Sequence, residues 1–210
     1  MDVLLTGFEP FDGEDTNPSW DAVDAVRPDG YRLTTLRLPC VFGDSLTALR
    51  DALAARRYDL VVCVGQAGGR AGVTPERVAV NLDDARIPDN AGARPIDEPV
   101  VPGGPAAYFT GLPVKACVAA LQAEGIPASV SHSAGTFVCN HVFYGLMHLV
   151  ATEHPDVRAG FVHVPFSPEQ AEGRDHPSLP VATTARALEL VVRTALSTTT
   201  DLRTTAGTLH

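Results

Sequence analysis

Short apolar runs alternate along the chain with segments whose apolar residues recur at helical spacing. Near-continuous or alternating apolar residues predict strands at 3–6, 31–38, 59–65, 77–82, 126–131 and 159–164. Apolar residues three and four positions apart predict helices at 17–26, 42–55, 114–124, 140–153 and 183–196. Strands that alternate with helices favour a three-layer α/β/α sandwich with a mixed, largely parallel central sheet.

Two stretches depart from this regular alternation. Residues 83–111 form a long connection that is rich in proline and glycine, and a loop of that length in a compact domain is usually functional. The threonine-rich tail after about residue 197 is expected to be loose. Neither an internal repeat nor a linker divides the chain, so residues 1–210 are predicted to form a single domain.

Composition and charge narrow the class of protein. The 210 residues carry a formal net charge of -9, which argues against a nucleic-acid partner because such binding depends on clustered Lys and Arg. We expect no membrane segment, since every apolar run is far shorter than the roughly 20 residues that a bilayer requires. The start lacks the basic region of a signal peptide. The four cysteines show no metal-binding spacing, so reduced thiols in a cytoplasmic protein are expected, with no metal site.

Cys139 occupies the position in the chain that best suits a nucleophile. It follows a predicted strand at 126–131 and a turn of small residues at 133–136, and it lies where the next helix begins. Unpaired N–H groups and the helix dipole at such a position favour a thiolate. The alternative is a buried cysteine that packs as a small apolar side chain.

A cysteine nucleophile requires a base and a group that orients the base. His163 is the histidine of interest because an imidazole within an apolar strand is costly unless it is hydrogen-bonded. Its alternative role is that of a core histidine bonded to a backbone carbonyl. Glu76, Asp83 and Asp84 are all candidates for the orienting carboxylate, and the residues alone do not choose among them.

Two loops follow predicted strands and could border a ligand site. Phe8 and Phe11 lie in a loop that is rich in glycine and proline, where they either line a pocket or anchor the loop to the core. Residues 66–70 follow the apolar run at 59–65, at the end of the sheet where open α/β folds bind ligands. They match neither dinucleotide nor P-loop patterns, so a nucleotide cofactor is not expected.

Several motifs in order along the chain give it a specific resemblance, which extends nearly from end to end. The chain resembles pyrrolidone carboxyl peptidase, also called pyroglutamyl peptidase type I. The motifs that carry the resemblance are residues 4–11 (LLTGFEPF), 17–20 (NPSW), 64–70 (VGQAGGR), 74–82 (TPERVAVNL), 84–90 (DARIPDN), 103–108 (GGPAAY) and 133–144 (SAGTFVCNHVFY).

The resemblance implies a cysteine exopeptidase that removes an N-terminal pyroglutamyl residue from peptides without a cofactor. It implies Cys139 as nucleophile, His163 as base and Glu76 as orienting carboxylate, with the Cys139 N–H and Arg86 receiving the oxyanion. It also implies a cytoplasmic homotetramer. The residues that it places around the lactam ring of the substrate are Phe8, Phe11, Gln66, Ile87, Phe137 and Val138.

Two departures from the family pattern lie near the expected pocket. Asp12 precedes Gly13 where the family commonly has two glycines, and Cys40 follows Pro39 where a threonine is common. Both bear on affinity and loop mobility rather than on the reaction. Two rival hypotheses keep the fold: a cysteine hydrolase with a different ester, thioester or amide substrate, and a binding protein without catalysis.

Overall fold

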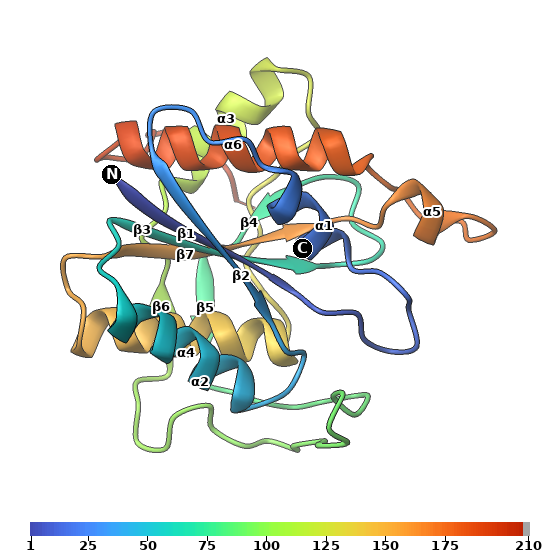
Figure 1. Cartoon of the computed structure of the whole chain (residues 1–210), viewed down its shortest axis with the longest axis vertical. Coiled ribbons are helices and arrows are strands. Elements are labelled where there is room, and N and C mark those ends of the chain that lie inside the picture. Colours follow the sequence, from blue (N-terminus) through green and yellow to red (C-terminus); the bar gives the residue numbers. More distant parts are fainter. Residues whose placement is uncertain (208–210) are drawn as a thin grey trace.

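The computed structural model describes residues 1–207, and its centre is a sheet of five strands in the order β2-β1-β3-β7-β4 (Figure 1). β1, β2, β3 and β7 are parallel, whereas the short β4 runs antiparallel to β7. The predicted mixed, largely parallel sheet is therefore confirmed. The strand bounds are Asp2–Phe8 (β1), Arg32–Leu38 (β2), Leu60–Gln66 (β3), Thr74–Pro75 (β4), Val78–Val80 (β5), Ala107–Phe109 (β6) and Arg158–Val164 (β7).

Helices cover both faces of this sheet and complete the predicted sandwich. α1, α3 and α6 pack on one face, while α2 and α4 pack on the other (Figure 1). None of the helices within residues 1–207 combines the length and the apolar character needed to cross a bilayer. The helix bounds are Pro18–Ala25 (α1), Asp44–Ala55 (α2), Val114–Ala123 (α3), Val138–Thr152 (α4), Pro168–Ala171 (α5) and Val181–Ser197 (α6).

The central strand β3 explains why its sequence is apolar at nearly every position. Val62 packs into the core beneath α1, α3 and α6, whereas its neighbour Val61 packs into the core beneath α2 and α4. Both side chains are fully buried, because successive residues of a strand point to opposite faces. Each buried side chain of this size contributes roughly 1.5–3 kcal/mol. The buried strand therefore fixes the position of Gln66, its last residue, and of the loop that follows.

The segment 126–131 differs from the buried strand that its sequence predicts. It runs beside β4 at the outer edge of the sheet, and only isolated bridges join Ala128 to Val73 and Ser131 to Glu76. Pro75 has no N–H with which to continue the ladder, which shortens regular pairing here. Most of the segment is half-buried or exposed, so its small residues reflect an edge rather than a core position.

Other elements also differ from the predicted ones, most of them by one to three residues at their ends. The predicted strand at 77–82 is present only as β5, which pairs with β6 in a separate two-stranded sheet that packs against α4. α4 begins at Val138 rather than at residue 140. The short elements β4, β6 and α5 were not predicted, because elements of two to four residues carry no periodicity.

Residues 198–207 are attached to the body of the protein through Asp201, whereas the sequence predicts a loose tail after about residue 197. Both carboxylate oxygens of Asp201 accept hydrogen bonds from the first turn of α3, at 3.1 Å from the Lys115 N–H and 2.9 Å from the Ala116 N–H. These are groups that no residue of α3 itself can satisfy. Asp201 therefore acts as a cap for α3, while residues 208–210 lie outside the described part of the chain.

Candidate active site

The turn before α4 is held in place from the long connection that follows β5. Thr136 and Asp84 exchange two hydrogen bonds, one from the Asp84 N–H at 2.9 Å and one from the Thr136 hydroxyl at 2.8 Å. Gly135 has a φ of 78°, which favours glycine. Phe137 then caps α4 without a side-chain hydrogen bond, so no side chain occupies the N–H groups of the first turn. Cys139 is the second residue of the helix.

The thiol of Cys139 lies over the carboxyl end of β3. A Cβ atom placed on Gly65 would be only 2.7 Å from the Cys139 sulfur, so the absence of a side chain at Gly65 makes room for the thiol. Gly65 is the register partner of His163 on the adjacent parallel strand β7. Paired residues of parallel strands point to the same face, so the imidazole of His163 and the thiol over Gly65 both lie on the α4 side of the sheet.

His163 is bonded to a carboxylate rather than to a backbone carbonyl. Its Nδ1 lies 2.7 Å from Oε1 of Glu76, and the side chain of Glu76 is completely buried. Glu76 follows β4, and its N–H donates to the carbonyl of Phe161 on β7 at 2.9 Å. The ring of Phe161 lies 4.9 Å from the imidazole and restricts its movement. With Nδ1 committed to Glu76, Nε2 is the nitrogen left for the thiol.

The two other candidate carboxylates lie elsewhere. Asp83 bonds to a different histidine, with its Oδ2 2.7 Å from Nδ1 of His141. His141 Nε2 accepts from the N–H of Gly43, so this second pair ties α4 to the start of α2. Asp84 is exposed and contacts the turn through its backbone. Of the three carboxylates, the structure brings only Glu76 to His163.

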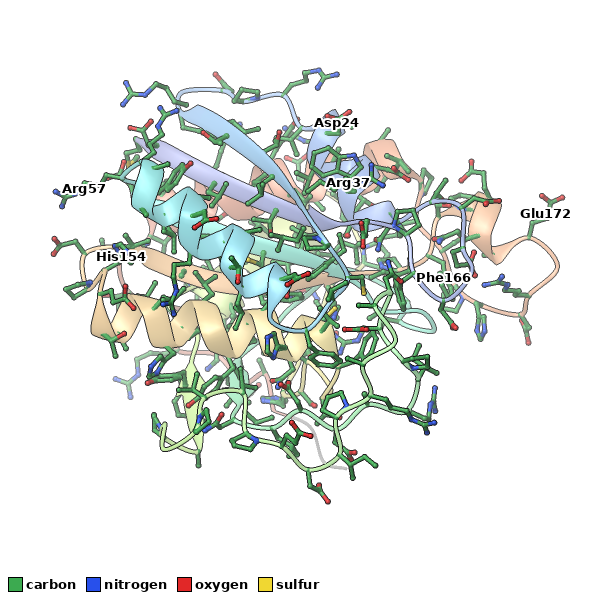
Figure 2. The ribbon with its side chains drawn as sticks, turned by 60° about the horizontal axis from the view of Figure 1, so that its bottom comes forward. Asp24, Arg37, Arg57, His154, Phe166 and Glu172 are labelled. Atoms are coloured by element: carbon green, nitrogen blue, oxygen red, sulfur yellow. The ribbon has the colours of Figure 1, made fainter. Side chains whose placement is uncertain are left out.

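The two ends of the sheet differ in which residues they gather. Figure 2 labels His154, which follows α4, at one end of the molecule and Phe166, which follows β7, at the other. Cys139 at the start of α4 and His163 near the end of β7 belong to the Phe166 end. His154 is therefore separated from the thiol by the length of α4.

Burial sets the protonation states of the three groups. Burial raises the pKa of the Cys139 thiol well above its usual value, and the neighbouring Cys40 and Glu76 raise it further. Burial also lowers the pKa of His163, against the opposing effect of Glu76. For Glu76, burial alone would raise the pKa, but the His163 hydrogen bond and the charge of Arg70 lower it. These directions favour a protonated thiol, a neutral imidazole and an ionised carboxylate, and they oppose the thiolate expected from the helix dipole alone.

Aromatic side chains form a half-buried wall beside the start of α4. The rings of Phe11 and Phe137 lie 6.1 Å apart, and Phe42 meets Phe137 edge-on at 5.4 Å. By contrast, Phe8 is 2% exposed and Val138 is fully buried, so both belong to the core rather than to an accessible wall. The structure thus separates the expected pocket residues into accessible ones and supporting ones.

The remaining expected residues surround the same end of the sheet. Gln66 is half-buried, and its Oε1 accepts a hydrogen bond from Nε2 of Gln170 at 3.2 Å. Ile87 is half-buried, whereas Arg86 is exposed and forms no side-chain hydrogen bond within residues 1–207. Both follow Asp84, the residue that is bonded to the turn before α4. Cys40 is buried, and its N–H donates to Glu9 at 3.0 Å.

Three residues that the sequence analysis did not assign also belong to this region. Arg70 contacts Glu76, Phe42 completes the aromatic wall, and Gln170 fixes the amide of Gln66. Arg70 lies in one of the motifs that carried the resemblance, but its role depends on the loop that returns it to Glu76. In the sequence, Phe42 resembled the first core residue of a helix. No sequence pattern near Gln170 indicates that it belongs to the site.

Comparison with known proteins gives a consistent result in sequence and in structure. The family model described as pyroglutamyl peptidase matches residues 1–198. Pyrrolidone-carboxylate peptidases of Streptomyces coelicolor and Cupriavidus taiwanensis are 60% and 56% identical to the chain, each over 99% of both sequences.

Solved structures of similar chains have the same architecture. The crystal structure of pyroglutamyl peptidase I from Bacillus amyloliquefaciens matches with a TM-score of 0.95 and 49% identity, and the match covers 97% of this chain and 99% of that one. A mutant pyrrolidone carboxyl peptidase from Pyrococcus furiosus matches with a TM-score of 0.89 and 40% identity over 93% and 98% of the two chains. With this fold, these identities and a family model that matches nearly the whole chain, the protein belongs to the pyroglutamyl peptidase family.

Proposed function

We propose that the protein hydrolyses the amide bond after an N-terminal pyroglutamyl residue and releases pyroglutamate, as a cysteine exopeptidase. The observation that carries this proposal is the cluster of a thiol, an imidazole and a buried carboxylate at the carboxyl ends of β3, β7 and β4. Membership of the pyroglutamyl peptidase family supports the substrate class.

In the proposed reaction, Nε2 of His163 takes the Cys139 proton as the sulfur attacks the pyroglutamyl carbonyl carbon. The carbonyl oxygen becomes an oxyanion, which the Cys139 N–H and Arg86 stabilise. The C–N bond then breaks, the leaving amine takes the proton from His163, and a thioester remains. Water, deprotonated by His163, hydrolyses this thioester and restores the thiol. Glu76 stabilises the imidazolium in both steps. The proposed series of steps requires no metal or cofactor.

For the lactam ring, we propose a pocket whose accessible walls are Phe11, Phe137, Gln66 and Ile87. Phe8 and Val138 support it from the core, which their burial favours. A neutral five-membered ring suits an apolar, aromatic site with a few polar groups. Because its nitrogen is an amide, no carboxylate is needed to receive a free amine.

Release of the chromophore from a pyroglutamyl arylamide tests the proposed function directly. We expect turnover by the purified protein and no turnover after alkylation of its thiols. If the arylamide is inert while Cys139 still reacts with an acylating thioester, the protein is a cysteine hydrolase with another substrate. An inert arylamide together with an unreactive Cys139 would indicate a binding protein.

Glu76 and Asp83 form a matched pair for testing the orienting carboxylate, since each lies 2.7 Å from Nδ1 of a buried histidine. We expect Glu76→Gln to lower kcat by about 10²–10³-fold, because the amide no longer stabilises the imidazolium. This is less than the roughly 10⁴-fold of a serine triad, since a thiol releases its proton more readily than a hydroxyl. Asp83→Asn should stay within about tenfold of the original kcat. Steady-state kinetics of both variants would contradict the proposal if their ranking were reversed.

We propose further that residues 1–210 form one pyroglutamyl peptidase domain, which the family match over residues 1–198 supports. The four cysteines are unpaired, as suits a reducing cytoplasm, where we place the protein. The net charge of -9 argues against a nucleic-acid partner.

We also propose a homotetramer, from the resemblance alone. Sedimentation at micromolar concentration should then give a species of several times the 22.2 kDa of one chain. A single species at the mass of one chain would contradict it.

A further inference from the structure

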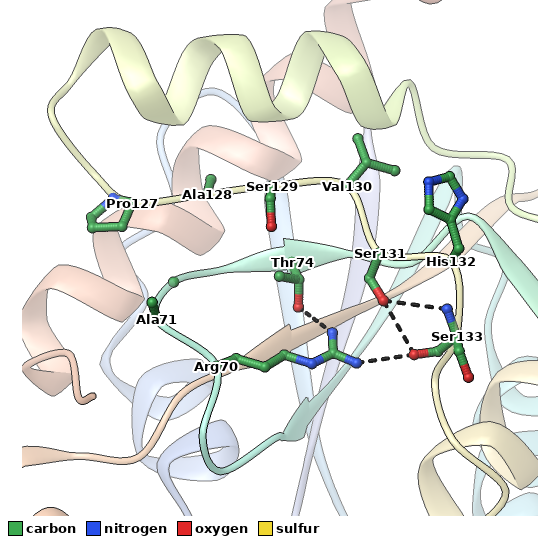
Figure 3. A pocket seen from close by; sticks show the side chains of 11 residues that line it. Arg70, Ala71, Thr74, Pro127, Ala128, Ser129, Val130, Ser131, His132 and Ser133 are labelled. Carbon is green, nitrogen blue, oxygen red and sulfur yellow. Dashed lines mark hydrogen bonds between the residues drawn. The ribbon is translucent and has the colours of Figure 1, made fainter. Parts of the chain in front are cut away.

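A groove of about 680 Å³ lies at the edge of the sheet, beside the carboxylate of the candidate site (Figure 3). Its walls are the loop at 70–72, Thr74 of β4, and the edge segment 127–133. β4 separates this groove from β7, which carries His163. The guanidinium of Arg70 crosses the groove and points toward Thr74 and Ser133 in Figure 3.

Arg70 contacts three residues in two parts of the chain, at β4 and at the turn before α4. Its Nη1 donates to Oε1 of Glu76 at 2.6 Å and also to the Thr74 hydroxyl. Its Nη2 donates to the carbonyl of Ser133 at 2.9 Å. Ser133 opens the turn that leads to Cys139, so one side chain links the carboxylate to the segment that carries the thiol. A planar guanidinium can bond to several acceptors in this way, whereas a lysine ammonium offers only a point charge.

The hydrogen bonds of Glu76 make its position depend on Arg70. A single oxygen, Oε1, receives both His163 at 2.7 Å and Arg70 at 2.6 Å. Oε2 is buried and has no hydrogen-bond partner within residues 1–207. Without Arg70, Glu76 would keep only neutral groups beside it, the His163 imidazole and the nearby Ser131 hydroxyl. A fully buried carboxylate without a positive partner is costly as an anion, and it could rotate to exchange its two oxygens. Arg70 removes both problems.

We propose that Arg70 is a positioning residue for the reaction: it keeps Glu76 ionised and keeps Oε1 directed at Nδ1 of His163. This inference rests on the proposed function, in which His163 accepts the thiol proton. Arg70 acts through Glu76 and touches neither the thiol nor the scissile bond. Thr74 and Ser133 in turn hold the guanidinium in place.

The positive charge of Arg70 also bears on the titration of the site. The ionisable groups that act on His163 are Glu76 after β4 and Arg70 in the loop after β3. The same two groups act on Cys139, which also faces the thiols of Cys40 after β2 and Cys63 on β3. Arg70 lowers the pKa of both His163 and Cys139. His163 can accept a proton only when it is neutral, above its pKa. Loss of the arginine therefore moves the acidic limb of kcat/KM, and thiolate formation at Cys139, to higher pH.

The test compares Arg70→Gln, Arg70→Lys and the control Ser129→Ala, which lines the same groove without a bond to Arg70. We expect Arg70→Gln to lower kcat by about 10- to 100-fold, with KM within about threefold. Its acidic limb should move up by about one pH unit. Arg70→Lys should keep the limb in place and recover part of kcat, and Ser129→Ala should behave as the unmodified protein.

A second measurement is independent of the substrate: the rate at which iodoacetamide alkylates Cys139, recorded against pH. The profile of Arg70→Gln should shift to higher pH, and that of Arg70→Lys should not. If the arylamide were inert, the proposed function would fail, but the alkylation profile would still decide whether Arg70 acts on the thiol. The two failures can therefore be told apart. Unshifted alkylation and activity profiles in a folded Arg70→Gln would overturn the inference. An equal loss of kcat in Arg70→Lys and Arg70→Gln, with the alkylation and activity profiles of both variants unshifted, would also overturn the inference.

Discussion

Replacing Cys139 with alanine is expected to remove turnover of pyroglutamyl substrates, with a loss in kcat of about 10⁶-fold. Without the sulfur, no thioester forms, and His163 and Glu76 have no nucleophile to activate. The substitution removes one atom from a half-buried position and leaves a small void beside Gly65, so the fold should remain. Assays with a pyroglutamyl arylamide, together with thermal unfolding of the variant, measure both expectations.

Cys117 supplies the matched control. It is fully buried on the opposite face of the sheet, in the core with α1 and α6, so Cys117→Ala should cost stability but not catalysis. Iodoacetamide should label Cys139 before Cys63, because Cys139 is only half-buried whereas Cys63 is fully buried and inaccessible to the reagent. Retention of turnover within tenfold in Cys139→Ala would exclude thiol chemistry as the basis of the activity.

The second large effect is discrimination between a pyroglutamyl and a prolyl residue at the N-terminus. Both rings offer similar apolar contact to Phe11 and Phe137, so the aromatic wall alone discriminates weakly. The polar groups decide. Gln170 holds Oε1 of Gln66, so we expect the Gln66 amide N–H groups to donate to the lactam carbonyl. A prolyl ring provides no such acceptor, and its ammonium would lose water without gaining a partner among the uncharged wall residues.

Sites that hydrogen-bond a substrate group reject analogues that lack it by roughly 10⁴-fold or more. We therefore expect ready cleavage of pyroglutamyl-alanyl substrates, with kcat/KM at least about 10⁴ times that of the prolyl-alanyl ones. Glutamyl-alanyl substrates, which carry both an ammonium and an open chain, should be equally poor. Comparable kcat/KM for the pyroglutamyl and prolyl substrates would retain a cysteine peptidase but reject the lactam pocket.

The sheet could be predicted from the sequence because its central strands are buried on both faces. β3 and β7 are apolar at nearly every position, whereas helices such as α2 and α6 carry polar residues at regular intervals. The edge of the sheet was less predictable. Residues 126–131 have the small and apolar composition of a strand, but their pairing depends on β4, a two-residue strand that ends in Pro75.

For the site, the sequence indicated a thiol and an imidazole. It could not decide which of three carboxylates within nine positions orients the imidazole. The antiparallel pairing of β4 with β7 decides among them, because it sets Thr74 opposite His163 and brings Glu76 alongside. That register is a property of two segments almost ninety residues apart. The contact of Arg70 with Glu76 was missed for the same reason. It arises only after the loop that follows β3 folds back across the edge of the sheet.

The raised pKa of the Cys139 thiol bears on how the protein reacts with oxidants. Peroxides oxidise the thiolate to sulfenic acid and further to irreversible acids, whereas the protonated thiol reacts slowly. If Cys139 becomes anionic only while His163 takes its proton, as in the proposed reaction, a vulnerable sulfur is exposed for a small part of each catalytic cycle. The burial that raises the pKa of Cys139 should then make the idle protein react more slowly with peroxide than one with a permanently charged nucleophile.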